Sequence, residues 1–239
     1  DMLLAPLQKT NKRDKHAVGF LDELKRQAEA AKAQQQTDSA SSERNTALAD
    51  VACKTSFAYL ATLAQQLNVL QPVSKARYVL DKRHSFAALR MSEFRADARR
   101  KKLRDADVFD HVSLHCQLRS GQALEITKDF LPDIEKLEPR LRQCGAEVDA
   151  QAVRNPDNGK LVEMRYSLVA DFVLSVRITP DHERGRVQFQ LANLDGLETV
   201  VVEFPAFEVG TARLDELARW LVGEPHAFLK DGQQLRRVE

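Results

Sequence analysis

The sequence predicts an α+β protein: an N-terminal αα-hairpin, followed by an antiparallel β-sheet of about five to seven strands packed with two helices. Two patterns predict this fold. Apolar residues recur at helical spacing up to about residue 70, and an alternation with a period of two begins near residue 108. Short turn signals separate the later apolar runs, so neighbouring strands should pair antiparallel. Helices interrupt these strands too rarely for a doubly wound parallel sheet.

The N-terminal part is expected to be helical. A first helix should span residues 18–36, and small hydroxyl residues at 37–42 should break it because they prefer turns and caps. A second helix should then run to Leu70, where Pro72 ends it. Two helices joined by a short polar break predict the αα-hairpin. The thin apolar stripe of the first helix consists of Val18, Phe20, Leu21, Leu24, Ala28, Ala31 and Ala33.

Charge is distributed unevenly, although the formal net charge is only +1. Residues 75–104 hold eleven lysines and arginines against three acidic residues, whereas 105–239 are acidic in balance. We therefore expect an N-terminal arm with the helical hairpin over 1–74, a basic connector over 75–104, and an antiparallel α+β domain over 105–239. The first sixteen residues, which contain Lys9, Lys12, Arg13 and Lys15, resemble a basic arm.

Local structure within the basic connector is harder to assign from the pattern. Residues 76–80 fit a short strand, and the apolar residues of 85–95 fit either a strand or a helix. Residues 96–104 consist mostly of alanine, arginine and lysine, which favour helices. We expect this last stretch to be helical rather than extended.

Elements of the C-terminal domain follow from alternation and turn residues. A strand over 112–118 should continue, after a turn at Ser120-Gly121, into a return strand with Leu124 and Ile126. A helix over 130–143 should stop at Gly145. Further strands are expected over 147–154, 160–166, 168–178, 186–191 and 198–204.

Turn and cap residues mark the rest of this domain. Asn158-Gly159 suits a tight hairpin turn, and the apolar run 168–178 should be a central strand. Thr211 is expected to cap a final helix that Gly223 ends. The polar tail 231–239 is expected to be loose.

The basic connector supplies one set of candidate binding residues. Such a patch can neutralise phosphates without reading sequence. The alternatives are that these cations pair with the acidic C-terminal half, or that they meet an anionic lipid or another polyanion. The candidates are Arg95, Arg99, Arg100, Lys101, Lys102, Arg104, Arg77, Lys82 and Arg83.

The second predicted helix supplies a set of candidate interface residues. Its apolar face is long enough to overhang a β domain of this size, so it can serve a dimer or another protein partner. The alternative is that the same face belongs to the intramolecular core. The candidates are Leu48, Val51, Phe57, Leu60, Leu63 and Leu67.

No motif for catalysis, metal or cofactor binding is found. His111 and His115 lie on a predicted strand, where four residues separate Cα atoms by about 13 Å, too far for one ion. The nine glycines occur singly, so neither a P-loop nor a dinucleotide fingerprint can be assembled. A nucleophile elbow is also missing from the sequence. We expect no catalytic residue, no metal and no cofactor.

Cysteine usage and hydropathy bear on location. Cys53, Cys116 and Cys144 are odd in number and widely spaced, a poor framework for disulfides, and this favours a reducing, cytoplasmic setting. The longest apolar-rich stretch, 167–178, is interrupted by charged residues, so no transmembrane segment is expected.

These observations favour a non-enzymatic interaction or assembly module whose helical part mediates self-association or partner docking. The partner would be another protein or a second copy of the chain. One alternative is a nucleic-acid-associated protein that uses residues 75–104. Another is a small-molecule or lipid binder with a cavity formed by a curved sheet, and an enzyme is less favoured.

Overall fold

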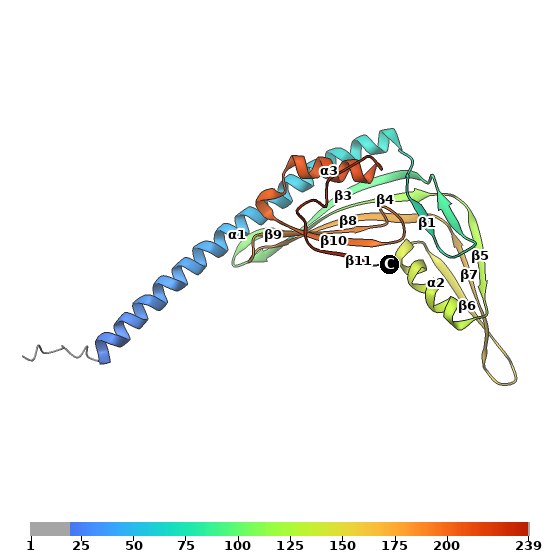
Figure 1. Cartoon of the computed structure of the whole chain (residues 1–239), viewed down its shortest axis with the longest axis horizontal. Helices are drawn as coiled ribbons and strands as arrows, with labels where there is room; N and C mark the ends of the chain where they lie inside the picture. The colour runs from blue at the N-terminus through green and yellow to red at the C-terminus, as the bar shows by residue number, and fades with distance from the viewer. Residues whose placement is uncertain (1–19, 239) are drawn as a thin grey trace, which may run out of the picture. The chain divides into compact units, whose positions relative to one another are not determined.

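A computed structural model describes residues 20–238 of the chain (Figure 1). The three helices within this range are α1 (Phe20–Leu70), α2 (Leu131–Cys144) and α3 (Thr211–Leu221), and a 3₁₀ turn spans Ala206–Glu208. The strands are β1 (Arg77–Val79), β2 (Ser85–Ala87), β3 (Arg90–Leu103), β4 (Ala106–Arg119), β5 (Ala123–Lys128), β6 (Val148–Arg154), β7 (Leu161–Val169), β8 (Phe172–Asp181), β9 (Arg186–Ala192), β10 (Thr199–Pro205) and β11 (Gln233–Val238). The α+β class predicted from the sequence is confirmed.

The predicted αα-hairpin is not confirmed, because α1 is one uninterrupted helix of 51 residues. Its hydroxyl-rich stretch stays helical: Thr37 Oγ1 donates to the Ala33 carbonyl at 3.0 Å, a bond that the helix tolerates. Glycine and proline, the strong helix breakers, are missing between residues 20 and 71. The helix ends where Gln71 adopts a φ of 44° before Pro72, as the sequence predicts.

The chain divides into two compact units within α1, between Ser41 and Ser42. The domain boundaries expected from the sequence at 74 and 104 stay predictions. The basic N-terminal arm over 1–16 and the start of the first predicted helix lie outside the described residues.

The larger unit is built on a six-stranded antiparallel sheet with the order β11-β10-β9-β8-β4-β3. Alternate side chains of its strands, such as Leu114, Val176 and Phe189, are fully buried on one face. The second half of α1 and the helix α3 lie side by side over that face (Figure 1) and are joined where Tyr59 donates to Asp215 at 2.6 Å. β8 is a central strand of this sheet, as predicted, although it begins at Phe172.

A three-stranded sheet, in the order β5-β7-β6, continues from the larger one. The strands β4 and β8 pair in the large sheet, and their continuations β5 and β7 pair in the small one. The prediction that β5 returns along β4 is therefore wrong. Asp171 explains the bend, because its carboxylate accepts the backbone N–H groups of Ser120 at 2.8 Å and Gly121 at 2.9 Å.

Several local predictions are confirmed around the small sheet. The helix α2 ends at Gly145 in the left-handed conformation, with a φ of 71°. Here a Cβ would also lie only 3.0 Å from Val173. The predicted hairpin of β6 and β7 is present, but its loop spans residues 155–160 and only Gly159 of the pair Asn158-Gly159 has a positive φ, of 67°. The final helix α3 is present, but its N-cap is Gly210 and not Thr211.

Two stretches differ from their predicted state. Residues 96–104, expected to be helical, form most of β3 and the turn after it, because pairing with β4 half-buries Ala96 and Ala98 against the core. Arg104 and Asp105 close this hairpin with φ values of 48° and 67°. The tail expected to be loose forms β11, an edge strand paired with β10.

Candidate interaction surfaces

Most of the interface candidates on α1 belong to the core of the larger unit. Leu60 is fully buried and Leu67 is 4% exposed, whereas Leu48, Phe57 and Leu63 are half-buried against the same core. Val51 is different, because it is 61% exposed. The structure thus leaves Val51 as the free apolar side chain of this set.

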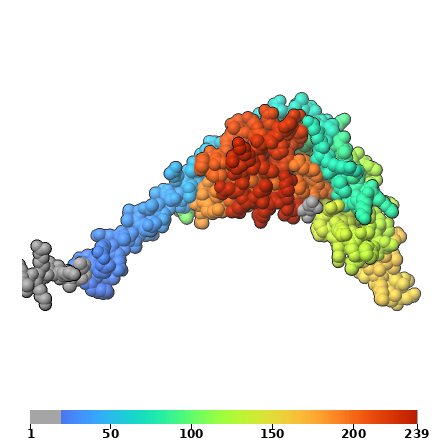
Figure 2. All heavy atoms as spheres, viewed as in Figure 1, coloured from blue at the N-terminus to red at the C-terminus, as the bar shows by residue number. Residues whose placement is uncertain are grey.

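Two groups of large apolar side chains on α1 are exposed: Val69 and Leu70 at its end, and three side chains within five residues at its beginning. Phe20 is 80% exposed, Leu21 63% and Leu24 43%. None of the side chains of residues 20–41, which we call the exposed helix segment, is buried. Figure 2 shows this segment, in blue, as a column no wider than a single helix. The sequence contained this signal as the thin stripe of the first predicted helix.

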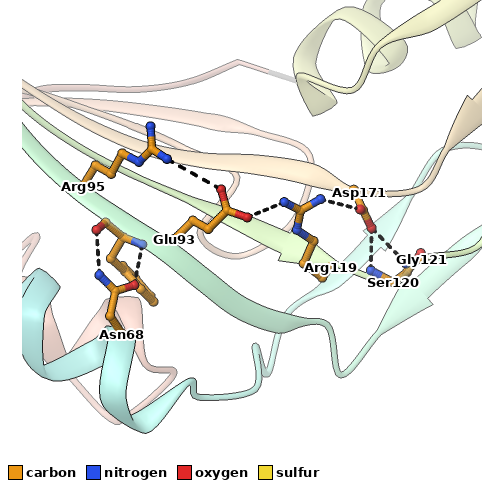
Figure 3. Close-up of polar contacts among 8 residues, drawn as sticks. Asn68, Glu93, Arg95, Arg119, Ser120, Gly121 and Asp171 are labelled. Atoms are coloured by element: carbon orange, nitrogen blue, oxygen red, sulfur yellow. Dashed lines mark hydrogen bonds and ion pairs between the residues drawn. The ribbon is translucent and has the colours of Figure 1, made fainter.

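The second half of α1 is fixed to the larger unit by polar side chains as well as by apolar burial. Asn45 Nδ2 donates to the Glu183 carbonyl at 2.7 Å, and Asp50 accepts the Phe109 N–H at 2.8 Å. Asn68 pairs with the backbone of Phe94 in both directions, at 2.8 and 2.9 Å (Figure 3). These bonds satisfy backbone groups of strands and turns that would otherwise lack a partner.

The contact of Asn68 coincides with a β-bulge in β3. Glu93 and Phe94 together oppose a single residue of β4, and Glu93 has a φ of 55°. Phe94 is directed into the core and is 3% exposed. The bulge turns Glu93 toward the opposite face, where it lies between Arg95 and Arg119 (Figure 3).

Arg119 links the bulge to the bend between the two sheets. It forms ion pairs with Glu93 at 2.5 Å and with Asp171 at 2.9 Å (Figure 3). Burial alone would raise the pKa of Asp171, but the N–H groups that it accepts and the Arg119 guanidinium outweigh burial and lower it. We interpret this chain of charges as a structural element that fixes the bend.

A groove of about 1,010 Å³ lies at the bend. Its walls combine apolar side chains such as Leu124 and Val148 with the carboxylates of Glu125, Glu147 and Asp149. Because Arg119 is already paired with two carboxylates, the remaining charges favour a cationic ligand over an anionic one.

The predicted polyanion candidates are spread over two regions. Arg77, Lys82 and Arg83 lie on or between the short strands β1 and β2. Arg95, Arg99, Arg100, Lys101 and Lys102 lie on β3, and Arg104 lies in the turn that follows it. The structure therefore does not gather all nine cations into one patch.

About half of the cations around β3 already have a partner within the protein. Arg100 pairs with Asp107 at 2.6 Å and stacks over Phe109, and Lys101 pairs with Asp110 at 3.2 Å. Arg95 lies 3.9 Å from Glu93. These contacts agree with the alternative that the basic segment is neutralised within the chain, and they reduce the charge available to a polyanion.

The histidines and cysteines form no metal site among residues 20–238, where no group of three or more metal-ligating side chains comes together. His111 and His115 share the open face of β4, and His115 lies 3.9 Å from Asp97. The three cysteines are free and buried. Burial, helped by Asp50, raises the pKa of the Cys53 thiol to about 12, and burial alone does the same for Cys116.

Comparison with protein-family models, with curated proteins and with solved structures finds no match for this chain. No helix within residues 20–238 has the length and hydropathy that a membrane crossing requires.

Proposed function

We propose that the chain is a non-enzymatic assembly module whose exposed helix segment docks onto a helix of another protein. The observation that carries the proposal is the exposure of Phe20, Leu21 and Leu24 on a segment that buries no side chain. Large apolar side chains clustered at one place on an exposed surface are typical of interaction sites.

The spacing of this apolar stripe suits a helical partner. Leu21, Leu24, Ala28 and Ala31 recur at three- and four-residue intervals, the pattern of the a and d positions of a heptad. The two leucines supply most of the apolar contact, and the two alanines allow a close approach between helices. The stripe can therefore receive large apolar side chains from the facing helix.

Charge along the stripe favours a partner with an acidic rim. Lys25 and Lys32 each follow a d position, so they lie at the edge that faces a partner helix. In a parallel dimer of two such segments, Gln27 of one copy would lie opposite Lys32 of the other. A glutamine and a lysine form no ion pair. Glutamates at that position would pair with the lysine, so we commit to an acidic partner helix.

Anchoring of the second half of α1 supports this role. Helix nucleation is the costly step, and residues 42–70 of the same helix are already packed. The exposed helix segment can thus extend an existing helix, and docking loses little additional backbone entropy.

The test uses two synthetic helical peptides of about four heptads, both with leucine at a and d, one with glutamate and one with lysine at e and g. Fluorescence anisotropy of each labelled peptide should show binding of the acidic peptide and none of the basic one. Leu21→Ser with Leu24→Ser should abolish binding. The matched control, Val51→Ser with Val69→Ser, removes two exposed side chains from the anchored half and should leave affinity unchanged.

Three results would contradict the proposal: equal binding of both peptides, binding of neither, or equal loss in the control variant. Analytical sedimentation of the protein without peptide tests the alternative that the exposed helix segment binds a second copy of the chain. A concentration-dependent dimer that disappears in the Leu21→Ser, Leu24→Ser variant would replace the acidic partner with a second copy.

We propose a cytoplasmic location for this function. Its support is the set of three free, buried cysteines, which suits a reducing compartment. The alternative nucleic-acid role has less support, because three cations around β3 are already paired with carboxylates.

A further inference from the structure

The open face of the large sheet has a polar hollow at the end where β3, β4 and β8 run together. Its volume is about 610 Å³, and its lining includes Arg99, His111, Ser113 and Arg177. Each of these side chains is on the face opposite the buried one, because Val112, Leu114 and Ile178 in the same strands point into the core. The hollow is therefore on the face opposite α1, and it shares no lining residue with the groove at the bend.

The register of the strands brings these residues together. Arg99 on β3 is opposite His111 on β4, and Arg177 on β8 is opposite Ser113, two residues further along β4. The two arginines thus flank the central strand, separated by two strand spacings of about 5 Å each. Their long side chains can reach one group bound above His111 and Ser113.

Both arginines lack a carboxylate partner within the described residues. Arg177 Nη2 lies 3.1 Å from His111 Nδ1, its single recorded side-chain contact, and Arg99 has none. A guanidinium beside an imidazole is left with most of its hydrogen-bonding capacity unused, since arginine carries five N–H donors. These free donors distinguish Arg99 and Arg177 from Arg100 and Arg119, which carboxylates already hold.

Two carboxylates, those of Asp97 and Asp110, also line the hollow. Asp110 is engaged by Lys101 at 3.2 Å and by His111 at 2.9 Å, and these contacts lower its pKa. Asp97 is largely exposed and lies 3.9 Å from His115. The lining itself thus holds two arginines and two aspartates, and Lys101, from outside the lining, offsets Asp110, which leaves Asp97 as the remaining carboxylate opposed to the two arginines.

We propose that this hollow binds the phosphate group of a small phosphorylated ligand, held by Arg99 and Arg177 with Ser113 and His111 beneath it. Arginine forks match the oxygens of phosphate, and a serine hydroxyl can donate to a further oxygen. The volume lies within the roughly 300–1,000 Å³ of small-molecule sites, so it exceeds the needs of phosphate alone. No phenylalanine, tyrosine or tryptophan lines the hollow, which disfavours stacking of a single-stranded nucleic acid.

The experiment titrates pyrophosphate into the full chain at constant ionic strength and follows the imidazole signals of His111 by NMR, with calorimetry for affinity. Saturable shifts of His111 are expected. Arg99→Gln and Arg177→Gln should each raise the dissociation constant at least about fivefold, because each removes one bidentate contact. Lys102→Gln, which removes a free cation from the same strand outside the hollow, should change it less than about twofold.

The proposal is overturned by the absence of saturable binding, or by equal weakening in all three variants, which would indicate general charge attraction. Arg99 is exposed on an edge strand and has no recorded side-chain partner among the described residues, so its replacement should not affect folding. Arg99→Gln therefore tests the site even if Arg177→Gln perturbs folding. A labelled single-stranded oligonucleotide distinguishes the source of the phosphate. Tighter binding of the oligonucleotide than of pyrophosphate, lost in Arg99→Gln, would assign the site to a nucleic-acid backbone instead.

Discussion

The two halves of α1 show how one helix can hold two different kinds of surface. In residues 20–41 the recorded polar contacts run within the helix, as between Glu23 and Gln27 at 3.1 Å. In residues 42–70 the side chains contact residues far along the chain: Asn45 reaches Glu183, and Tyr59 reaches Asp215. Helix geometry alone does not distinguish these halves. Tertiary contacts therefore stabilise the second half, whereas the first half depends on continuation of the helix.

The largest effect expected from this comparison is on the free energy of unfolding. Leu60→Ala should lower it by about 2–5 kcal/mol, because Leu60 is fully buried and its truncation leaves a cavity. Leu24→Ala, in the exposed helix segment, should change it by less than about 0.5 kcal/mol. Urea unfolding followed by the fluorescence of the buried Trp220 measures both variants. If Leu24→Ala lowers the free energy of unfolding as much as Leu60→Ala, the two halves of α1 do not differ in the way described.

A smaller effect is expected at the bulge that α1 supports. Asn68→Ala removes both hydrogen bonds to the Phe94 backbone and should cost about 1–2 kcal/mol. Gln65→Ala, an exposed position one turn earlier without a recorded partner, serves as the control and should cost less than about 0.5 kcal/mol. Hydrogen exchange of the Phe94 amide should also be faster in Asn68→Ala. An unchanged exchange rate of the Phe94 amide would show that the bulge is stable without the hydrogen bonds from Asn68.

The smallest effect concerns alkaline pH. Burial and the hydrogen bond to Asp215 raise the pKa of Tyr59, and burial raises the pKa of Tyr78 to about 12. In the unfolded chain these phenols ionise near pH 10, while in the folded chain they stay protonated. Their contribution to stability is therefore complete below about pH 10 and is lost as the pH rises through the raised pKa values.

Tyr59→Phe removes one of these ionisations. Urea midpoints measured between about pH 9 and pH 11 should fall for the natural chain and fall less steeply for Tyr59→Phe. If the urea midpoints of the two proteins fall equally with pH, ionisation of Tyr59 does not contribute to the pH dependence of stability.

Prediction from the sequence succeeded where a local pattern agreed with the tertiary contacts. The alternation around Leu114 gave β4, and Asn158-Gly159 gave the hairpin of β6 and β7. It failed for residues 96–104, whose side chains favour a helix but whose backbone pairs with β4. Of the candidate interface residues, Leu60 and Leu67 are in the core, because helical periodicity identifies an apolar face without identifying what covers it.

Local sequence patterns are sufficient to predict the α+β class, the end of α1 before Pro72 and the alternating strands, because these depend on residues close together in the chain. The separation of β4 and β5 into different sheets depends on long-range contacts, since Asp171 holds the bend from about fifty residues away. Tertiary contacts likewise pair Arg100 and Lys101 with aspartates, whereas Arg99 has no recorded side-chain partner within residues 20–238. Strand register sets which charges meet, and register depends on contacts that no local pattern contains.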